Sequence, residues 1–153
     1  MKQLVLIFSV ALFAISATYQ DDATRKKHYN LENGLAIEGY DPVSYFSYNP
    51  KEGSKKLSYT YKSITYRFAT QANLDAFKKN PEKYEPQYGG WCAYAMGNDG
   101  SKVEVDPETY KIVGGKLYLF YNQFFNNTKK DWDKDEANLK AKADKNWANY
   151  LKK

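Results

Sequence analysis

Large apolar and polar side chains alternate in two stretches in the middle of the chain. In 57–68, apolar side chains occupy every second position on each side of Lys62-Ser63; they are Leu57, Tyr59, Tyr61, Ile64, Tyr66 and Phe68. A period of two residues is typical of β-strands, so this stretch predicts a β-hairpin. The stretches 109–113 and 116–122 flank Gly114-Gly115, a two-residue glycine turn that predicts a second hairpin.

Helical spacing follows the first hairpin and returns at the end of the chain. Thr70 is expected to cap a helix over 71–80 that ends at Asn80-Pro81, because the residue before a proline avoids the helical region. Beyond Asn127, apolar residues recur at intervals of three, four or seven, which predicts an amphipathic C-terminal helix. They include Trp132, Leu139, Ala143, Trp147, Tyr150 and Leu151.

These patterns together predict an α+β fold. We expect a small antiparallel sheet of hairpins with one central helix, and the C-terminal amphipathic helix packed on that sheet. One core should contain the apolar side chains of all these elements: Leu74, Phe77, Leu117, Leu119 and Trp147.

The N-terminal residues differ from the rest of the chain. Lys2 precedes the mainly apolar run 4–15, and the small residues Ser16-Ala17 lead into polar sequence. This is typical of a secretory signal peptide, and the run is short for a membrane span. We predict a signal peptide (1–17), a polar lead-in (18–32) and a single domain (33–153). The mature protein is then exported to the periplasm or the extracellular space; an uncleaved N-terminal anchor is the alternative.

Composition argues against several classes of function. The 153 residues include 23 Lys and Arg and 18 Asp and Glu, giving a net charge of +5, but only Arg25 and Arg67 are arginine. Nucleic-acid binders gather charge on one face and use arginine, so we expect no nucleic-acid partner. We also expect no membrane association after signal removal. No phosphate loop and no signature of a Cys–His nucleophile pair is found, so we expect no enzyme activity.

A set of motifs in a fixed order resembles the YHS-domain family over 33–150. The matching positions are Asp41-Pro42-Val43 at the start, Tyr66 and Phe68 in the hairpin, and Phe77, Pro81 and Tyr84 at the close. The resemblance implies an α+β fold related to small metal-binding domains. Typical members occur beside copper-transporting ATPases and are thought to bind soft metals through their cysteines.

The chain departs from this family at the positions that carry its cysteines. Ser44, Ala69 and Asn73 stand where typical members have cysteine. Serine and asparagine are poor ligands for copper or zinc, and alanine is none. The metal site that the resemblance implies is therefore not carried over to these positions.

The single cysteine, Cys92, offers a replacement site. It cannot form an intramolecular disulfide. Cys92 and Met96 are four residues apart, a spacing that is expected to place both on one face, and thiolate with thioether suits Cu(I). Trp91 and Tyr94 would shield the sulfurs from water, which makes them candidate binding residues.

A third ligand is open between His28, the only histidine, and Asp41. Cys92 has two other interpretations: a buried apolar side chain, or a reactive or intermolecularly paired thiol. The leading hypothesis is an exported, non-catalytic YHS-like binding domain that handles a soft metal, copper, through Cys92. The alternatives are a protein-interaction or structural module that has lost the metal site and binds an unidentified protein partner, and a thiol-redox protein.

Overall fold

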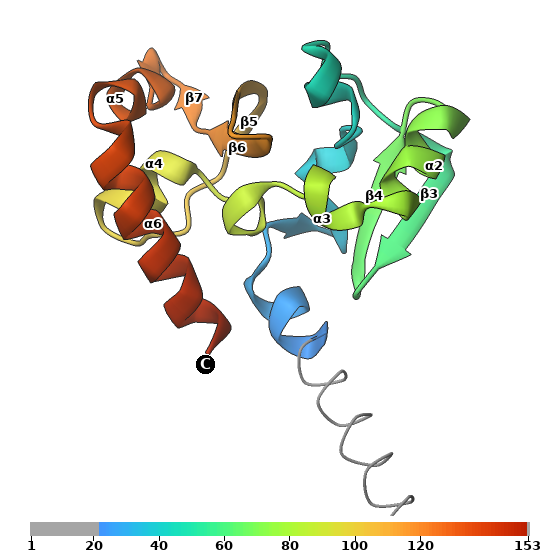
Figure 1. The fold of residues 1–153 in the computed structure, drawn as a ribbon, viewed down its shortest axis with the longest axis horizontal. Coiled ribbons are helices and arrows are strands. Elements are labelled where there is room, and N and C mark those ends of the chain that lie inside the picture. Colours follow the sequence, from blue (N-terminus) through green and yellow to red (C-terminus); the bar gives the residue numbers. More distant parts are fainter. Residues whose placement is uncertain (1–21, 153) are drawn as a thin grey trace, which may run out of the picture.

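The computed structural model describes residues 22–152, which form a small α+β fold as predicted (Figure 1). Residues 22–28 are helical. The further α-helices are α2 (Gln71–Lys79), α3 (Pro81–Tyr84), α4 (Ala93–Asn98), α5 (Lys129–Lys134) and α6 (Glu136–Leu151). The 3-10 helices are η1 (Ile37–Gly39), η2 (Ser44–Ser47) and η3 (Gln87–Gly90). The strands are β1 (Leu31–Glu32), β2 (Leu35–Ala36), β3 (Ser54–Tyr61), β4 (Ile64–Phe68), β5 (Asp106–Val113), β6 (Lys116–Phe120), β7 (Asn122–Gln123) and β8 (Asn126–Asn127). The predicted signal peptide at 1–17 lies outside the described residues. Within 22–152, no helix combines the length and the apolar character that crossing a membrane requires.

Both predicted hairpins are confirmed, and each belongs to its own sheet. The first sheet has the order β1-β2-β4-β3, with β2 and β4 parallel and the other pairs antiparallel. β5 pairs with β6, and β7 pairs with β8, in two further antiparallel sheets. The turn residues Lys62-Ser63 and Gly114-Gly115 all have positive φ. This is the conformation in which a two-residue loop matches the twist of its strands.

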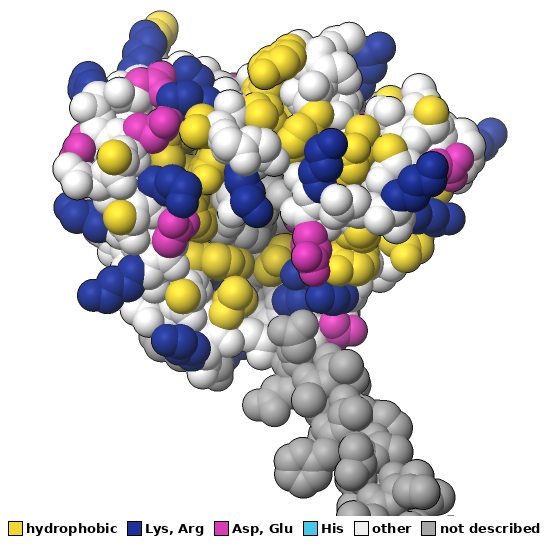
Figure 2. Space-filling model, viewed as in Figure 1, with side chains coloured by type: hydrophobic (Ala, Val, Ile, Leu, Met, Phe, Trp, Pro, Cys, Tyr) yellow, Lys and Arg dark blue, Asp and Glu magenta, His cyan; other side chains and the backbone are white. Residues whose placement is uncertain are grey.

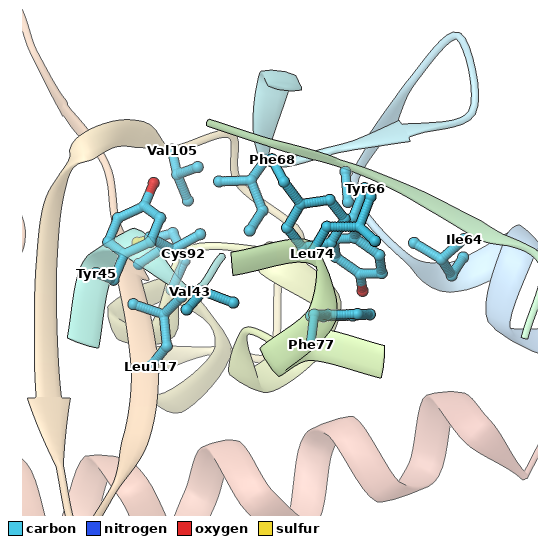
Figure 3. Close-up of a cluster of buried hydrophobic side chains, with 14 residues drawn as sticks. Val43, Tyr45, Ile64, Tyr66, Phe68, Leu74, Phe77, Cys92, Val105 and Leu117 are labelled. Carbon is cyan, nitrogen blue, oxygen red and sulfur yellow. The ribbon is translucent and has the colours of Figure 1, made fainter. Parts of the chain in front are cut away.

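The predicted helix after the first hairpin is confirmed as α2, and it covers the inner face of β4. The Thr70 hydroxyl caps α2 by accepting a hydrogen bond from the Asn73 amide at 3.1 Å. Phe77 points from α2 at the strand, with its ring centroid 4.8 Å from that of Tyr66 and 5.1 Å from that of Phe68. These rings form the centre of the first hydrophobic cluster (Figure 3).

The C-terminal helix builds a second hydrophobic cluster with α4 and β6. α6 runs beside α4 (Figure 1), so closely that a Cβ on Gly97 would lie 2.4 Å from the Leu139 carbonyl oxygen. Met96 and Trp132 are buried between these elements. Trp147, which we expected in the same core as Phe77, packs against this second cluster instead. The single predicted core is therefore two adjacent clusters.

The expected polar lead-in is part of the folded domain from residue 22 onward. Arg25, from the helical residues 22–28, forms a buried ion pair with Glu85 (2.5 Å), and Glu85 also accepts a hydrogen bond from the Tyr66 hydroxyl (2.7 Å). Arg25 also donates to the Lys62 carbonyl oxygen at 3.2 Å. The structured domain therefore begins before the boundary predicted at residue 33, because a polar segment can dock through a buried charge pair without an apolar pattern.

Candidate functional site

The Asp41 carboxylate is the centre of a buried hydrogen-bond network. Oδ1 accepts hydrogen bonds from the backbone amides of Val43 (2.8 Å) and Ser44 (3.3 Å). Oδ2 accepts from the Ala69 backbone amide (2.8 Å) and from the side-chain amide of Asn73 (2.7 Å). Asp41 is 0% exposed, and all four donors are neutral. Burying a carboxylate is unfavourable unless its oxygens are hydrogen-bonded, and this network meets that requirement.

Three separate elements supply these donors. Asp41 lies in the turn that leads into η2, and Ser44 is the first residue of η2, where its hydroxyl donates to the Asp41 carbonyl oxygen at 2.7 Å. Ala69 follows the end of β4, and Asn73 lies in the first turn of α2. Ser44, Ala69 and Asn73 are the positions at which the sequence resemblance expects cysteines. The structure brings all three to one carboxylate.

Cys92 is buried in the first cluster, below a surface depression of about 330 Å³. Its thiol is 0% exposed, so Cys92 lies under the floor of the depression and not in contact with solvent. The sulfur lies 3.3 Å from the Thr128 hydroxyl and accepts a hydrogen bond from the Tyr121 amide at 3.4 Å. Tyr94 lines the same depression. Figure 3 shows Cys92 among apolar side chains.

Cys92 and Met96 pack into different clusters, which corrects the prediction that their spacing places them together. Met96 belongs to the second cluster and is 0% exposed. Cys92 is the N-cap of α4, and its ψ of 117° is not helical. The direction of its side chain is therefore not set by the helix that contains Met96. The four-residue rule applies within one regular element and fails here, because Cys92 lies outside the helix that contains Met96.

His28 is also buried, at 6% exposure, and it lies beside Trp91. The Trp91 indole N–H donates to the His28 carbonyl oxygen at 2.7 Å, and His28 Nδ1 lies 2.9 Å from Lys102 Nζ. Burial, together with the charge of Lys27, lowers the pKa of Lys102. His28 therefore serves the attachment of the N-terminal segment to the loop that carries Cys92.

The candidate ligands do not come together as a metal centre in this structure. Among residues 22–152, no group of three or more His, Cys, Asp or Glu side chains is arranged to hold a metal ion. Asp41 uses both oxygens in hydrogen bonds, His28 lies beside Lys102, and Cys92 is bonded to Thr128 and Tyr121.

A second surface depression, of about 420 Å³, is acidic. Glu32, Glu38 and Glu104 line it beside the first strand pair and η1. Partial burial, and then the charges of Glu32, Glu104 and Asp106, raise the pKa of Glu38. The sequence alone does not identify this group, because Glu104 is distant in the chain from Glu32 and Glu38 and only the fold brings it beside them.

The comparisons with known proteins identify no relative. No protein-family model, no curated protein and no solved structure matches this chain.

Proposed function

We propose that this protein is a non-catalytic binding domain of the YHS-like type, in which the metal-ligand positions hold a hydrogen-bond centre around Asp41. The supporting observation is that Ser44, Ala69 and Asn73 all donate to this one carboxylate. Asp41 and Asn73 are 32 residues apart, so this convergence comes from the fold and not from local sequence.

The donors around Asp41 favour loss of the metal site over its retention. Four N–H groups point at the carboxylate, and their partial positive charges occupy the directions from which a cation would approach. A metal ion at Asp41 would have to displace at least two of these hydrogen bonds. Side chains of serine, alanine and asparagine offer a soft metal nothing in return.

The environment of Cys92 favours a packing role over redox chemistry. A reactive cysteine needs an accessible thiolate, and this sulfur is covered and hydrogen-bonded in the core. Because Asp41 and Cys92 are hydrogen-bonded inside the protein, a binding partner would have to contact surface side chains. Figure 2 shows basic and acidic side chains intermingled over one face, as on an ordinary solvated surface, without a patch of one sign.

Restoring the cysteines tests the proposal. The variant Ser44→Cys, Ala69→Cys, Asn73→Cys would be made with Cys92→Ser, so that only the restored thiols can bind. Titration with Cu(I) and with Zn²⁺ under reducing conditions should give about one bound ion for the variant and none for the wild type. Circular dichroism of the metal-free variant checks that it folds. A folded variant without metal affinity would contradict the assignment of these three positions.

The wild type and Cys92→Ser separate the two remaining functions. Stoichiometric Cu(I) uptake by the wild type that Cys92→Ser abolishes would favour soft-metal handling through Cys92. Labelling by a thiol reagent should be slow in the native protein and fast after unfolding in urea, because the reagent must wait for local opening. Fast native labelling would favour the thiol-redox function instead.

A further inference from the structure

Two adjacent phenylalanines form the tip of the β7–β8 hairpin, and both project into solvent. Phe124 is 87% exposed and Phe125 is 111% exposed, the highest values among the large apolar side chains of the described residues. Single exposed apolar side chains are common on protein surfaces. Two neighbouring phenylalanines without any cover are not, and such exposure marks an interaction site.

The backbone at this tip is in a conformation that phenylalanine disfavours. Phe124 and Phe125 have φ of 51° and 63°, and they occupy the two loop positions between β7 and β8. Asparagine and glycine are the residues that a two-residue loop with two positive φ angles prefers. The turn Lys62-Ser63 also has positive φ at both positions, so this geometry belongs to the hairpin, and the choice of two phenylalanines for it is what the turn itself does not explain.

The base of the hairpin holds the tip in place. The Thr128 backbone amide and hydroxyl both donate to the Tyr121 carbonyl oxygen, each at 3.0 Å. The Asn122 side-chain amide donates to the Thr109 hydroxyl at 2.9 Å, which ties the hairpin to β5. The phenylalanines are therefore presented on an anchored hairpin and not on a loose loop.

The charges around the tip fit a lipid surface. The residues that flank the two phenylalanines carry neutral amides: Asn122, Gln123, Asn126 and Asn127. Insertion of the tip would therefore bury no charge. At about 3.3 Å per strand residue, this collar lies within the 5–10 Å depth to which interfacial segments enter a bilayer. Lys129 and the exposed Lys130 follow the collar, and the next acidic residue, Asp131, is paired with Lys134 at 2.7 Å.

A second exposed aromatic side chain belongs to a segment near the same edge of the molecule. Tyr48, at 74% exposure, is the other strongly exposed aromatic side chain of the described residues. In Figure 1 the segment around residue 48 (teal) reaches the same upper edge of the molecule as the turn after β7. Both segments are therefore open to a partner that approaches from this side of the molecule.

We propose that the Phe124–Phe125 tip inserts into the surface of an anionic lipid membrane. This departs from the absence of membrane association expected from the sequence. One small apolar tip gives reversible binding, since stable anchoring takes two signals. Lys130 contributes attraction to anionic headgroups that salt weakens, while Lys129 is partly neutralised by Asp133 at 3.0 Å.

Co-sedimentation of the full chain with vesicles tests this proposal. The vesicles would contain phosphatidylcholine with about one third phosphatidylglycerol, or phosphatidylcholine alone. We expect binding to the anionic vesicles that weakens with added salt. Phe124→Asn with Phe125→Gly should weaken binding at least about tenfold, because it removes both inserting side chains. The same change supplies the preferred turn residues, so the melting temperature should be maintained or raised.

Leu151→Ser provides the matched control. Leu151 is also an exposed apolar side chain, but it lies at the C-terminal end of α6, away from the end that carries β7 (Figure 1). This variant should bind vesicles as the wild type does. Equal binding by the tip variant and the wild type would overturn the proposal. So would a wild type that ignores vesicles, including one that self-associates through the tip in analytical ultracentrifugation, since the partner would then be a second copy of the chain.

Discussion

Replacing Asp41 by asparagine tests whether the hydrogen-bond centre stabilises the fold. The substitution keeps the shape of the side chain and exchanges one carboxylate oxygen for an NH₂ group. Each oxygen accepts two hydrogen bonds, so in either orientation of the amide at least one backbone N–H would face another donor, because only the Asn73 side-chain amide can flip to accept instead. Because Asp41 is fully buried, water does not replace the lost bonds.

The magnitude follows from the number of bonds that are lost. A hydrogen bond to a charged group contributes about 1.5–3 kcal/mol, so losing at least one should lower the free energy of unfolding by at least about 1.5–3 kcal/mol. Total stabilities of domains are about 5–15 kcal/mol, so Asp41→Asn should be clearly destabilised. Asn73→Ala removes one donor and should lower the free energy of unfolding by about 1.5–3 kcal/mol.

Urea unfolding followed by circular dichroism measures these differences. The control is Gln71→Ala, also in the first turn of α2, whose side chain bonds to Asp75 on the exposed side of the helix. It should change the free energy of unfolding by less than about 0.5 kcal/mol. Asp41→Asn and Asn73→Ala should be less than additive when combined, because they share a bond. A midpoint for Asp41→Asn equal to that of the wild type would refute the reasoning.

Three further predictions concern the two clusters and the acidic depression. Phe77→Ala should lower the free energy of unfolding by about 3–5 kcal/mol. An unchanged melting temperature would contradict the position of Phe77 at the centre of the first cluster. Gly97→Ala should cost about 1–3 kcal/mol, because its Cβ would meet the Leu139 carbonyl oxygen; a melting temperature equal to that of the wild type would contradict the close approach of α4 and α6. The raised pKa of Glu38 means that stability present at acidic pH is lost as pH rises through that pKa. Glu38→Gln should therefore raise the melting temperature slightly at neutral pH and not at acidic pH, and equal shifts at both would exclude this origin.

The sequence determined the secondary structure of the middle of the chain. Alternation predicted β3 and β4, the glycine pair predicted the turn between β5 and β6, and Thr70 with Asn80-Pro81 bounded α2. These features depend on interactions between residues close in sequence, and such interactions can be predicted from the residue types and their spacing. The exposed tip also left a local signal, two phenylalanines between amide residues, although its meaning depended on their exposure.

The tertiary structure alone decided what the candidate residues do. The spacing of Cys92 and Met96 suggested a shared face, but the start of α4 fell between them and sent their side chains into different clusters. Arg25 and Glu85 are 60 residues apart, and no local pattern marks them as partners. A carboxylate such as that of Asp41 is a possible metal ligand by residue type. Only the tertiary structure places four N–H donors around it and makes it the hydrogen-bond centre. Hydrogen bonding and burial depend on which distant segments meet, and that is a property of the packed chain, because a residue's neighbours in space are not its neighbours in sequence.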